Sequence, residues 1–398
     1  MPTPLNPWLP ALPPFLAALV VTAAAVPLAR WLSFRVGLVD VPGGRHQHDQ
    51  PTALLGGLAL LLGFVVAIGA FGRGIGDWGE LVGVAIAVVV LFAVDDRQGL
   101  PAWTKLVLQT AGALVVAWGF GITVATVHLP GVVWTLGWLA IPLTVLWLVG
   151  MQNSINLLDG VDGLAAGVVA IVAAILTVAA VDRLGRNPGQ PEVIILSAAV
   201  IGACLGFLLF NFAPARIFMG DSGAHLLGLL IGIISIVGVA KTTAVLALFV
   251  PVVALGLPIG DTALAIVRRR RAGRSVASPD THHLHYRLLA LGLSPRETSI
   301  AFYLVTAILG CLGLAIFGHK KILALALVLL AVALVLLVVR VRRRHPLDLM
   351  TLVRGRPLPV ARPLRGGLDP VGERPAPPAP TEAARPQPRP VDPSHPRP

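Results

Sequence analysis

Carboxylates gather in three short polar stretches of an otherwise apolar chain. They are the pair Asp95-Asp96, the segment 153–167 (NSINLLDGVDGLAAG) and the segment 219–223 (MGDSG). Adjacent carboxylates repel each other, and their usual uses are to hold a cation or to share a proton. Asp221 could hold Mg²⁺, which in turn holds phosphates. The alternatives are a solvated helix end for Asp95-Asp96 and a helix cap for Asp221.

The segment 153–167 has the spacing of a helix that presents polar groups to a ligand. Asn153 and Asn156 are three residues apart, as are Asp159 and Asp162, so on a helical path each pair shares one face. Glycines beside the acids let the backbone approach a ligand closely. Acids at the edge of a bilayer are costly unless they have a function. The segment is therefore expected to line a site.

Arginine and histidine form a second group of candidates. The loop 40–57 holds Arg45 and His48 between glycines, which suits phosphate contact, although a turn-rich connector explains this loop equally well. Four arginines at 268–271 are more often a topology signal than a site. Histidines at 282, 283 and 285 are close enough to raise zinc as an alternative, but no cysteine or HExxH pattern accompanies them. Contact with phosphoryl oxygens is the favoured interpretation.

The segments that must position these groups are apolar. Of 398 residues, 56% are hydrophobic and only 13% charged, whereas soluble domains carry about 25% charged residues. This composition excludes a soluble protein and predicts an all-α, polytopic integral membrane protein. A bilayer core of about 30 Å takes roughly 20 apolar residues per helix. About eleven transmembrane helices are expected, at 11–34, 53–71, 78–94, 101–120, 133–151, 164–181, 192–210, 222–240, 242–262, 298–317 and 321–340.

Positive charge is distributed unevenly between alternate loops. One set of loops, together with the stretch that begins at Arg340, holds most of the arginines. The positive-inside rule makes this set cytoplasmic and puts the N-terminus outside. The net charge of +12 is then a topology signal rather than a sign of nucleic-acid binding. Every loop rich in Asp, Asn or His falls on the same side, which predicts a cytoplasmic active-site cleft.

The chain is expected to have two parts. Residues 1–345 form the membrane domain, and residues 346–398, rich in Pro and Arg, form a disordered cytoplasmic tail. The first apolar run is long enough to stay as an anchor, and the N-terminus lacks the pattern of a cleavable signal. Cys204 and Cys311 lie in apolar runs and are expected to be core residues.

Taken together, the polar stretches resemble those of the polyprenyl-phosphate N-acetylhexosamine-1-phosphate transferase family. The resemblance runs from about residue 38 to 290 and keeps the order of five motifs. The matching residues are Asp40-Val41-Pro42, Arg45, His48, Pro51-Thr52, Gly56-Gly57, Asp95-Asp96, Leu100-Pro101, Lys105, Gln109, Asn153, Asn156, Asp159-Gly160, Asp162-Gly163-Leu164, Met219–Gly223, Pro258, Asp261, Gly273, Ser275, Asp280, His283 and His285.

The resemblance implies a Mg²⁺-dependent enzyme, with Mn²⁺ as a conceivable substitute, that transfers a sugar 1-phosphate from a UDP-sugar to a lipid phosphate and releases UMP. Asp221 would be the metal ligand. Asp95 would be a base toward the lipid phosphate or a nucleophile, supported by Asp96. The implied substrate-binding residues are Arg45, His48, Lys105, Asn153, Asn156, Asp159, Asp162, Arg268, Asp280, His283 and His285.

Departures from the family pattern bear on the donor. His46 stands where the family often has Lys, and Tyr286 replaces the last His of the His-x-His-His pattern. Leu284 interrupts the three consecutive histidines of the muramoyl-pentapeptide branch, so the resemblance favours the UDP-N-acetylglucosamine branch of glycosyltransferase family 4. A transporter or lipid-binding membrane protein is the alternative of another class.

The expected setting follows from the same resemblance. The protein would lie in the inner (plasma) membrane as a multi-pass enzyme that begins the synthesis of a lipid-linked cell-envelope glycan, such as lipopolysaccharide or teichoic acid. Its partners would be a UDP-sugar, undecaprenyl or decaprenyl phosphate and the membrane, with no nucleic acid. A homodimer stays open.

Overall fold

A computed structural model describes residues 8–40, 51–72, 78–129, 132–183, 190–240, 284–290, 292–316 and 320–344, with isolated positions between 256 and 271. The chain divides into the units Met1–Arg356 and Pro357–Pro398, and every described residue lies in the first. The predicted disordered tail from residue 346 lies outside the described residues, as does the predicted span 242–262 apart from residues 256 and 260.

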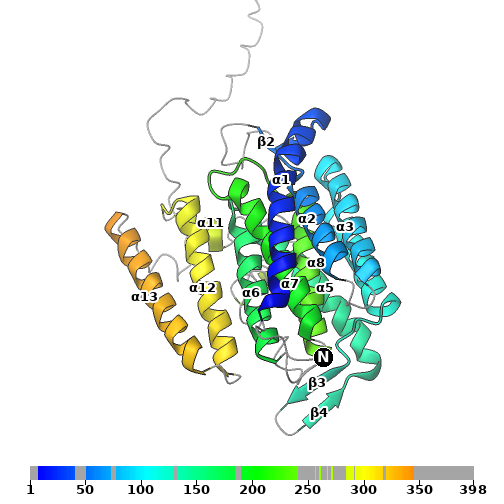
Figure 1. Cartoon of the computed structure of the whole chain (residues 1–398). Helices are drawn as coiled ribbons and strands as arrows, with labels where there is room; N and C mark the ends of the chain where they lie inside the picture. Colours follow the sequence, from blue (N-terminus) through cyan, green and yellow to red (C-terminus); the bar gives the residue numbers. More distant parts are fainter. Residues whose placement is uncertain are drawn as a thin grey trace, which may run out of the picture. The chain divides into compact units, whose positions relative to one another are not determined.

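The described part of the chain is almost entirely helical (Figure 1). Its α-helices are α1 (Leu12–Val36), α2 (Gly56–Phe71), α3 (Trp78–Gln98), α4 (Ala102–Leu114), α5 (Ala140–Leu158), α6 (Leu164–Arg183), α7 (Gln190–Asn211), α8 (Gly220–Ala240), α11 (Leu284–Ala290), α12 (Pro295–Ile316) and α13 (Lys320–Arg344). A π-helical stretch, Val115–Gly119, extends α4, and 3₁₀ turns at Leu9–Ala11 and Gly137–Leu139 precede α1 and α5.

The fold class of an all-α polytopic membrane protein is confirmed. Within the described ranges, 8 helices are long and apolar enough to cross a membrane, and α2 is a shorter apolar helix. Each expected span other than 242–262 overlaps one of the helices named above. The exact number of eleven stays a prediction.

The expected span 133–151 begins too early. Residues Val132–Thr135 form strand β4, which pairs antiparallel with β3 (Thr126–Leu129) in the register Thr126↔Thr135 and Leu129↔Val132. Both strands are rich in β-branched residues, which favour extended backbone. Gly137 then takes a φ of 51°, and the helix starts only at Ala140. The span is therefore α5 with its short 3₁₀ lead.

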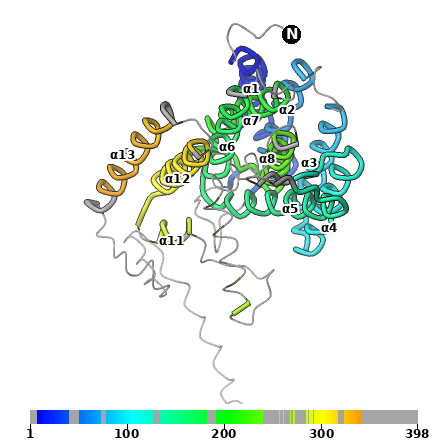
Figure 2. Tube along the Cα trace, turned by 90° about the horizontal axis from the view of Figure 1, so that it is seen from below, coloured from blue at the N-terminus to red at the C-terminus, as the bar shows by residue number. Residues whose placement is uncertain are grey.

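Helix α8 lies at the centre of the packing. It contacts α3 and α5 on either side, while α1 packs on α2 and α7, and α6 packs on α7 and α12 (Figures 1 and 2). The apolar window of α8 is 83% buried, against 6% for α13. Close packing on α5 depends on Gly228, since a Cβ there would lie 2.5 Å from Cα of Gln152. Small residues of this kind let membrane helices approach.

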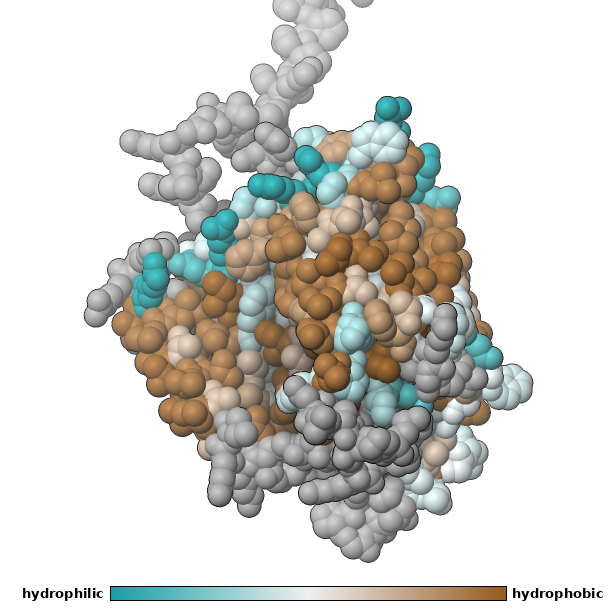
Figure 3. All heavy atoms as spheres, viewed as in Figure 1, coloured by the Kyte–Doolittle hydropathy of each residue, from teal (hydrophilic) through white to brown (hydrophobic). Residues whose placement is uncertain are grey.

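Apolar side chains cover the visible outer surface between the two ends of the helices (Figure 3). On α13, Leu325, Val328 and Leu336 are about 60% exposed, and α1 carries exposed Leu16, Val20 and Leu28. A soluble protein seldom exposes so continuous an apolar surface. The surface therefore fits contact with lipid chains.

The polar motifs meet at one end of these helices, which we call the acidic end because Asp95, Asp96 and Asp221 lie there. Strands β1 (Val39–Asp40) and β2 (Thr52–Ala53) pair antiparallel at this end. Ala53 also forms a parallel bridge with Ile217. The backbone nitrogens of Gly56 and Gly57 donate to the carbonyls of Phe218 and Met219, each over 3.0 Å. These bonds fix the chain just before Asp221.

Candidate active site

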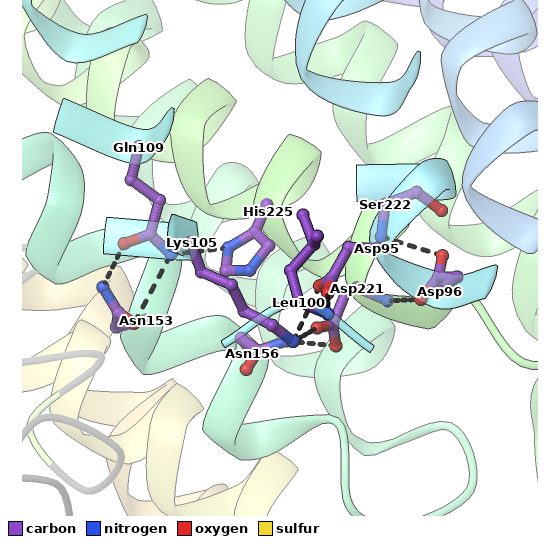
Figure 4. Close-up of polar contacts among 10 residues, drawn as sticks. All are labelled: Asp95, Asp96, Leu100, Lys105, Gln109, Asn153, Asn156, Asp221, Ser222 and His225. Carbon is purple, nitrogen blue, oxygen red and sulfur yellow. Dashed lines mark hydrogen bonds and ion pairs between the residues drawn. The ribbon is translucent and has the colours of Figure 1, made fainter. Parts of the chain in front are cut away.

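The first turn of α8 is held by a carboxylate from α3. Asp96 Oδ1 accepts a hydrogen bond from the backbone nitrogen of Asp221 over 2.7 Å, and Oδ2 accepts one from that of Ser222 over 3.3 Å (Figure 4). Free N–H groups at a helix start need such acceptors, and a carboxylate also suits the positive end of the helix dipole. Asp96 is therefore a cap for α8 supplied by another helix.

Gly220 makes this contact sterically possible. Its φ is 68°, in the left-handed region, and a Cβ at this position would lie 2.5 Å from Asp96 Oδ2. Any side chain at residue 220 would displace Asp96 and strain the backbone. The glycine of the MGDSG motif thus allows the close approach of Asp96 to the first turn of α8.

Lys105 joins the other two carboxylates of the acidic end. Its Nζ lies 2.7 Å from Asp95 Oδ2 and 2.5 Å from Asp221 Oδ2. The second oxygen of Asp221 accepts a 2.8 Å hydrogen bond from Asn156 Nδ2. Asp95 Oδ1 accepts a hydrogen bond from the backbone nitrogen of Leu100. Helices α3, α4, α5 and α8 therefore each contribute to one polar cluster (Figure 4).

The cluster contains three carboxyl groups, those of Asp95, Asp96 and Asp221, and one ammonium, that of Lys105, which contacts only Asp95 and Asp221. The side chain of Asp95 is 1% exposed, whereas those of Lys105 and Asp221 are 28% and 29% exposed. Of the two carboxylates that contact Lys105, Asp221 is thus the one within reach of solvent and of a ligand.

Asp221 fits the role of a magnesium ligand. The described residues contain no group of three or more His, Cys, Asp or Glu side chains placed to hold a metal ion. Mg²⁺ does not need one, because it usually keeps several waters and binds through one or two carboxylates and substrate phosphates. The carboxylate of Asp221 is partly exposed and lies beside that of Asp95, and this arrangement suits magnesium coordination of that kind. Magnesium binding at Asp221 stays a prediction.

A second layer of polar side chains lies one helical turn farther into the bundle than Lys105, Asn156 and Asp221. Gln109 follows Lys105 by four residues, His225 follows Asp221 by four, and Asn153 precedes Asn156 by three. Asn153 Nδ2 donates to Gln109 Oε1 over 2.8 Å, and Gln109 Nε2 lies 3.3 Å from His225 Nδ1. The His225 ring packs against the Phe92 ring, with centroids 3.9 Å apart and ring planes tilted by 41°. The layer connects α3, α4, α5 and α8 inside the bundle.

Asp159 and Asp162 lie in the turn between α5 and α6 and have different surroundings. Asp162 is 8% exposed, and its Oδ2 accepts a 2.8 Å hydrogen bond from the backbone nitrogen of Ala215. Asp159 is half-buried at the end of α5. Loss of water raises the pKa of Asp159 well above the ordinary 3.8, and the carboxylates of Asp221, Asp96 and Asp162 raise it further.

The α5–α6 turn is braced by residues that the sequence did not single out. Asn211 Oδ1 accepts a hydrogen bond from the nitrogen of Gly163 over 3.0 Å, and Ser299 Oγ donates to the carbonyl of Asp162 over 2.9 Å. Tyr303 donates to the carbonyl of Gly163. These partners come from α7 and α12, far away in sequence, and no spacing in the sequence links them to the turn.

His285 is the one histidine of the predicted group that lies in the described residues. It is the second residue of α11, is 2% exposed and packs against Gly160, where a Cβ would lie 2.6 Å from its Nε2. The structure therefore brings His285 to the turn that carries Asp159. The other predicted substrate-binding residues, Arg45, His48, Arg268, Asp280 and His283, lie outside the described residues.

His225 is a further residue of the cluster that sequence reasoning missed. It follows Asp221 at helical spacing, as Gln109 follows Lys105, and this repeat of four residues was the available signal. The residues that follow His225 in the sequence are apolar, so the pattern indicates only a membrane span at this histidine. The structure buries it to 1% exposure beside Gln109.

The fold and the site define an integral membrane protein of the helical-bundle class whose ionisable side chains converge at one end of the bundle. The profile of the family described as glycosyl transferase family 4 matches residues 78–239, which run from the start of α3 to the last turn of α8. The matched stretch contains Asp95, Asp96, Lys105 and Asp221.

Three relatives have informative names. The probable undecaprenyl-phosphate N-acetylglucosaminyl 1-phosphate transferase of Bacillus subtilis is 37% identical over 295 residues, 73% of this chain and 80% of the relative. The decaprenyl-phosphate N-acetylglucosaminephosphotransferase of Mycolicibacterium smegmatis is 38% identical over 74% and 79%. The phospho-N-acetylmuramoyl-pentapeptide-transferase of Geobacillus thermodenitrificans is 31% identical over 76% and 95%. The chain belongs to glycosyl transferase family 4, and the resemblance drawn from its motifs is confirmed.

Proposed function

We propose that this chain transfers N-acetylglucosamine 1-phosphate from UDP-N-acetylglucosamine to undecaprenyl or decaprenyl phosphate and releases UMP. The observation that carries the proposal is the meeting of Asp95, Lys105 and Asp221 at one end of a membrane bundle. Two relatives that share most of the chain are named for this kind of transfer. The product would begin a lipid-linked glycan of the cell envelope.

The reaction joins two anions. An oxygen of the lipid phosphate attacks the phosphorus that carries the sugar, and the bond from that phosphorus to UMP breaks. Catalysis of such a transfer rests on positioning and charge neutralisation more than on covalent chemistry. Lys105 supplies a positive charge between two carboxylates and can exchange one of them for a phosphate oxygen. In this single displacement Asp95 would serve as the base toward the lipid phosphate. As a nucleophile it would instead take the sugar phosphate as UMP leaves, and the lipid phosphate would displace Asp95 in a second step.

Magnesium is part of the proposal. Held by Asp221, Mg²⁺ would neutralise the diphosphate and stabilise the charge that develops on the leaving UMP. Asn156 would orient the Asp221 carboxylate through the hydrogen bond to its Oδ1. Asp96 would hold the backbone of the same residue. Both oxygens and the main chain of Asp221 are thus fixed by neighbouring helices, which suits a metal ligand that must not move.

The acidic end is proposed to face the cytoplasm, in a multi-pass protein of the plasma membrane. Arg35 and Arg97 lie in the last turns of α1 and α3 at this end. Arg216 lies in the segment between α7 and α8, and Arg296 donates to the carbonyl of Ala213 in the same segment. The positive-inside rule favours the cytoplasm for such a concentration. The N-terminus would then be outside and the C-terminal tail inside, where soluble UDP-sugars are made.

The second candidate donor is UDP-N-acetylmuramoyl-pentapeptide, because a relative is named for its transfer. That relative is 31% identical, below the 37% and 38% of the other two. Leu284 also interrupts the histidine run of that branch. A transporter would need ionisable groups along a path at mid-membrane. Asp95, Asp96 and Asp221 lie at helix ends instead, which supports an enzyme.

A donor panel tests the proposal. Membranes that contain the full chain, polyprenyl phosphate and Mg²⁺ are expected to release UMP from UDP-N-acetylglucosamine and to form a lipid-linked sugar phosphate, identified by mass spectrometry. Turnover with the muramoyl-pentapeptide donor alone would assign the second candidate. Absence of UMP with both donors would contradict the enzyme.

The role of Asp221 is tested in the same assay. We expect Asp221→Asn to lower UMP release by about 10²-fold or more, because charge stabilisation of this kind is usually worth that much. Glu80→Gln is the control, since Glu80 is exposed in the first turn of α3, away from the acidic end. Removal of Mg²⁺ from the unmutated chain with a chelator should lower UMP release as much as Asp221→Asn does. Full activity of Asp221→Asn would reject the metal assignment.

A further inference from the structure

The outward face of α1 carries a stripe of arginine and aromatic side chains near the acidic end. Its members are Pro27, Arg30, Trp31, Phe34 and Arg35, and they line a shallow hollow of about 430 Å³. Their spacing of three and four residues places them on one face of the helix. All five are exposed, with Trp31 at 53% and Phe34 at 46%. We call these five residues the α1 stripe.

Each arginine of the α1 stripe lies over an aromatic ring. The guanidinium carbon of Arg30 is 5.6 Å from the centre of the Phe34 ring, and that of Arg35 is 5.0 Å from the Trp31 ring. Stacking orients a planar guanidinium and leaves the N–H groups on its edge available to donate. Neither guanidinium group has an ion pair or hydrogen bond to the described part of the chain. Two forked donors are therefore available side by side for an anion.

The length of the first span puts the α1 stripe at the membrane surface. The helical stretch Leu9–Val36 has 28 residues, which corresponds to about 42 Å at 1.5 Å per residue. The bilayer core takes about 30 Å of it. With Trp8 and Leu9 at the opposite surface, roughly the last eight residues extend into the headgroup layer. The guanidinium groups then lie at the depth of lipid phosphates, and the aromatic rings lie at the edge of the acyl chains.

The α1 stripe is separate from the candidate active site. Helix α1 packs on α2 and α7, whereas the carboxylate cluster is built from α3, α4, α5 and α8. In the tube view, α1 lies on the other side of α8 from α4 and α5 (Figure 2). A lipid on the α1 stripe would therefore not be the lipid phosphate that reacts beside Lys105.

We propose that the α1 stripe binds an anionic glycerophospholipid of the surrounding membrane. The lipid phosphate accepts hydrogen bonds from Arg30 and Arg35, and an acyl chain lies along Trp31 and Pro27. Two cations and an apolar hollow complement a ligand that is anionic at one end and apolar at the other. A free phosphate would satisfy only the arginines, and a zwitterionic lipid would bring a second cation against them.

The bound lipid would stabilise the end of α1 and the segment beside it. On the opposite, buried side of the same turn, Ser33 Oγ accepts a 2.9 Å hydrogen bond from the nitrogen of Leu54. Ala53 in turn accepts a 2.8 Å bond from the nitrogen of Phe218. A ligand that binds only the folded chain raises its unfolding temperature. Thermal unfolding is therefore a readout of binding at the α1 stripe.

The test uses the full chain in detergent, with phosphatidylglycerol, phosphatidylcholine or inorganic phosphate added. The unmutated protein is expected to retain phosphatidylglycerol in native mass spectrometry and to unfold at a higher temperature with it, but not with phosphatidylcholine or phosphate. The double variant Arg30→Gln/Arg35→Gln should lose this shift and retain at least about tenfold less phosphatidylglycerol, the loss expected when even one hydrogen bond to a charged group is removed. Its unfolding temperature without lipid should match the unmutated protein.

Arg340→Gln is the matched control. Arg340 is exposed near the end of α13, a helix without aromatic residues, and it also carries a charge at the end of an apolar span. This variant should keep the lipid shift. An equal loss in Arg340→Gln, or an unchanged shift in the double variant, would overturn the proposal and leave the arginines as a topology signal. An equal shift with inorganic phosphate would also overturn it. None of these measurements depends on turnover, so failure here is distinguishable from failure of the proposed function.

Discussion

Asp96 accepts a hydrogen bond from the backbone nitrogen of Asp221 over 2.7 Å, although the two residues are 125 positions apart in the chain. The bond joins the end of α3 to the first turn of α8. The two carboxylates of the Asp95-Asp96 pair therefore have different partners: Asp95 contacts Lys105, and Asp96 contacts the main chain of α8. Adjacent carboxylates that looked equivalent in the sequence face different partners.

This division predicts different outcomes at Asp96 for different substitutions. Asn caps a helix about as well as Asp, so Asp96→Asn should keep the unfolding temperature close to that of the unmutated chain. Asp96→Ala should lower stability by about 1 kcal/mol, the usual effect of losing a cap. UMP release should follow the same order, with Asn above Ala. Equal and complete loss of activity in both variants, with unchanged stability, would instead make Asp96 a catalytic group.

Gly220 provides a second test of the same contact. Gly220→Ala puts a Cβ 2.5 Å from Asp96 Oδ2 at a φ of 68°. We expect a loss of about 1–3 kcal/mol in stability, the range for a strained backbone position, and a large fall in UMP release because Asp221 moves. Thermal unfolding and the turnover assay measure the two effects.

Gly79→Ala is the control for Gly220→Ala. Gly79 lies in the first turn of α3, is exposed, and a Cβ there meets nothing within 4 Å. Alanine is favoured over glycine in a helix, so this variant should be as stable as the unmutated chain or more stable. If both alanine variants behave alike, the close approach of Asp96 to residue 220 is wrong.

The second polar layer predicts coupling between Gln109 and His225. Removing one partner leaves the other buried without its bond, which costs about 1–3 kcal/mol, whereas replacing both by apolar groups can be nearly neutral. Gln109→Leu and His225→Leu should therefore each lower the unfolding temperature, and the double variant should lower it by less than the sum. Additive effects in this double-mutant cycle would show that the 3.3 Å contact carries no energy.

The fold and much of the site could be predicted because membrane helices are recognisable in a sequence by the length and composition of their apolar runs. Apolar runs gave the helices, and the carboxylates stood out as costly interruptions of these runs. The MGDSG motif, with Asp221 as its candidate ligand, was also visible in the sequence. The start of α5 could not be predicted, because the apolar β-branched residues of β4 look like the beginning of a membrane helix.

The contacts that fix the site depend on the packing of distant helices. No local spacing indicates that Asn211 and Tyr303 hold the backbone of Gly163, or that Asp96 serves α8 rather than its own helix. His225 lies at the right spacing after Asp221, but only the position of Gln109 on α4 makes that spacing meaningful. A sequence indicates which residues are costly in the membrane, and tertiary packing determines which of them meet.

Asp159 makes stability depend on pH in a direction opposite to that of most carboxylates. Folding raises the pKa of Asp159 well above 3.8, because its carboxyl loses water and faces Asp221, Asp96 and Asp162. The folded chain therefore holds this proton at pH values where the unfolded chain has released it. The contribution to stability is complete below the unfolded pKa and is lost as pH rises through the folded pKa.

Asp159→Asn tests this dependence, since asparagine has no proton to lose. We expect the unfolding temperature of the variant to rise relative to that of the unmutated chain as pH rises from about 4 toward 8. The corresponding difference in free energy of unfolding should grow by at most about 1.4 kcal/mol per pH unit, the limit for one group. Asp162→Asn is the comparison variant. Asp162 Oδ2 accepts a hydrogen bond from the backbone nitrogen of Ala215, and loss of this bond should destabilise the α5–α6 turn. A constant difference between Asp159→Asn and the unmutated chain at every pH would mean that Asp159 ionises in the folded protein as it does in the unfolded one. The carboxyl would then be available as an anion at the site, and the predicted contact of Asp159 with substrate would have to involve a cation rather than a protonated acid.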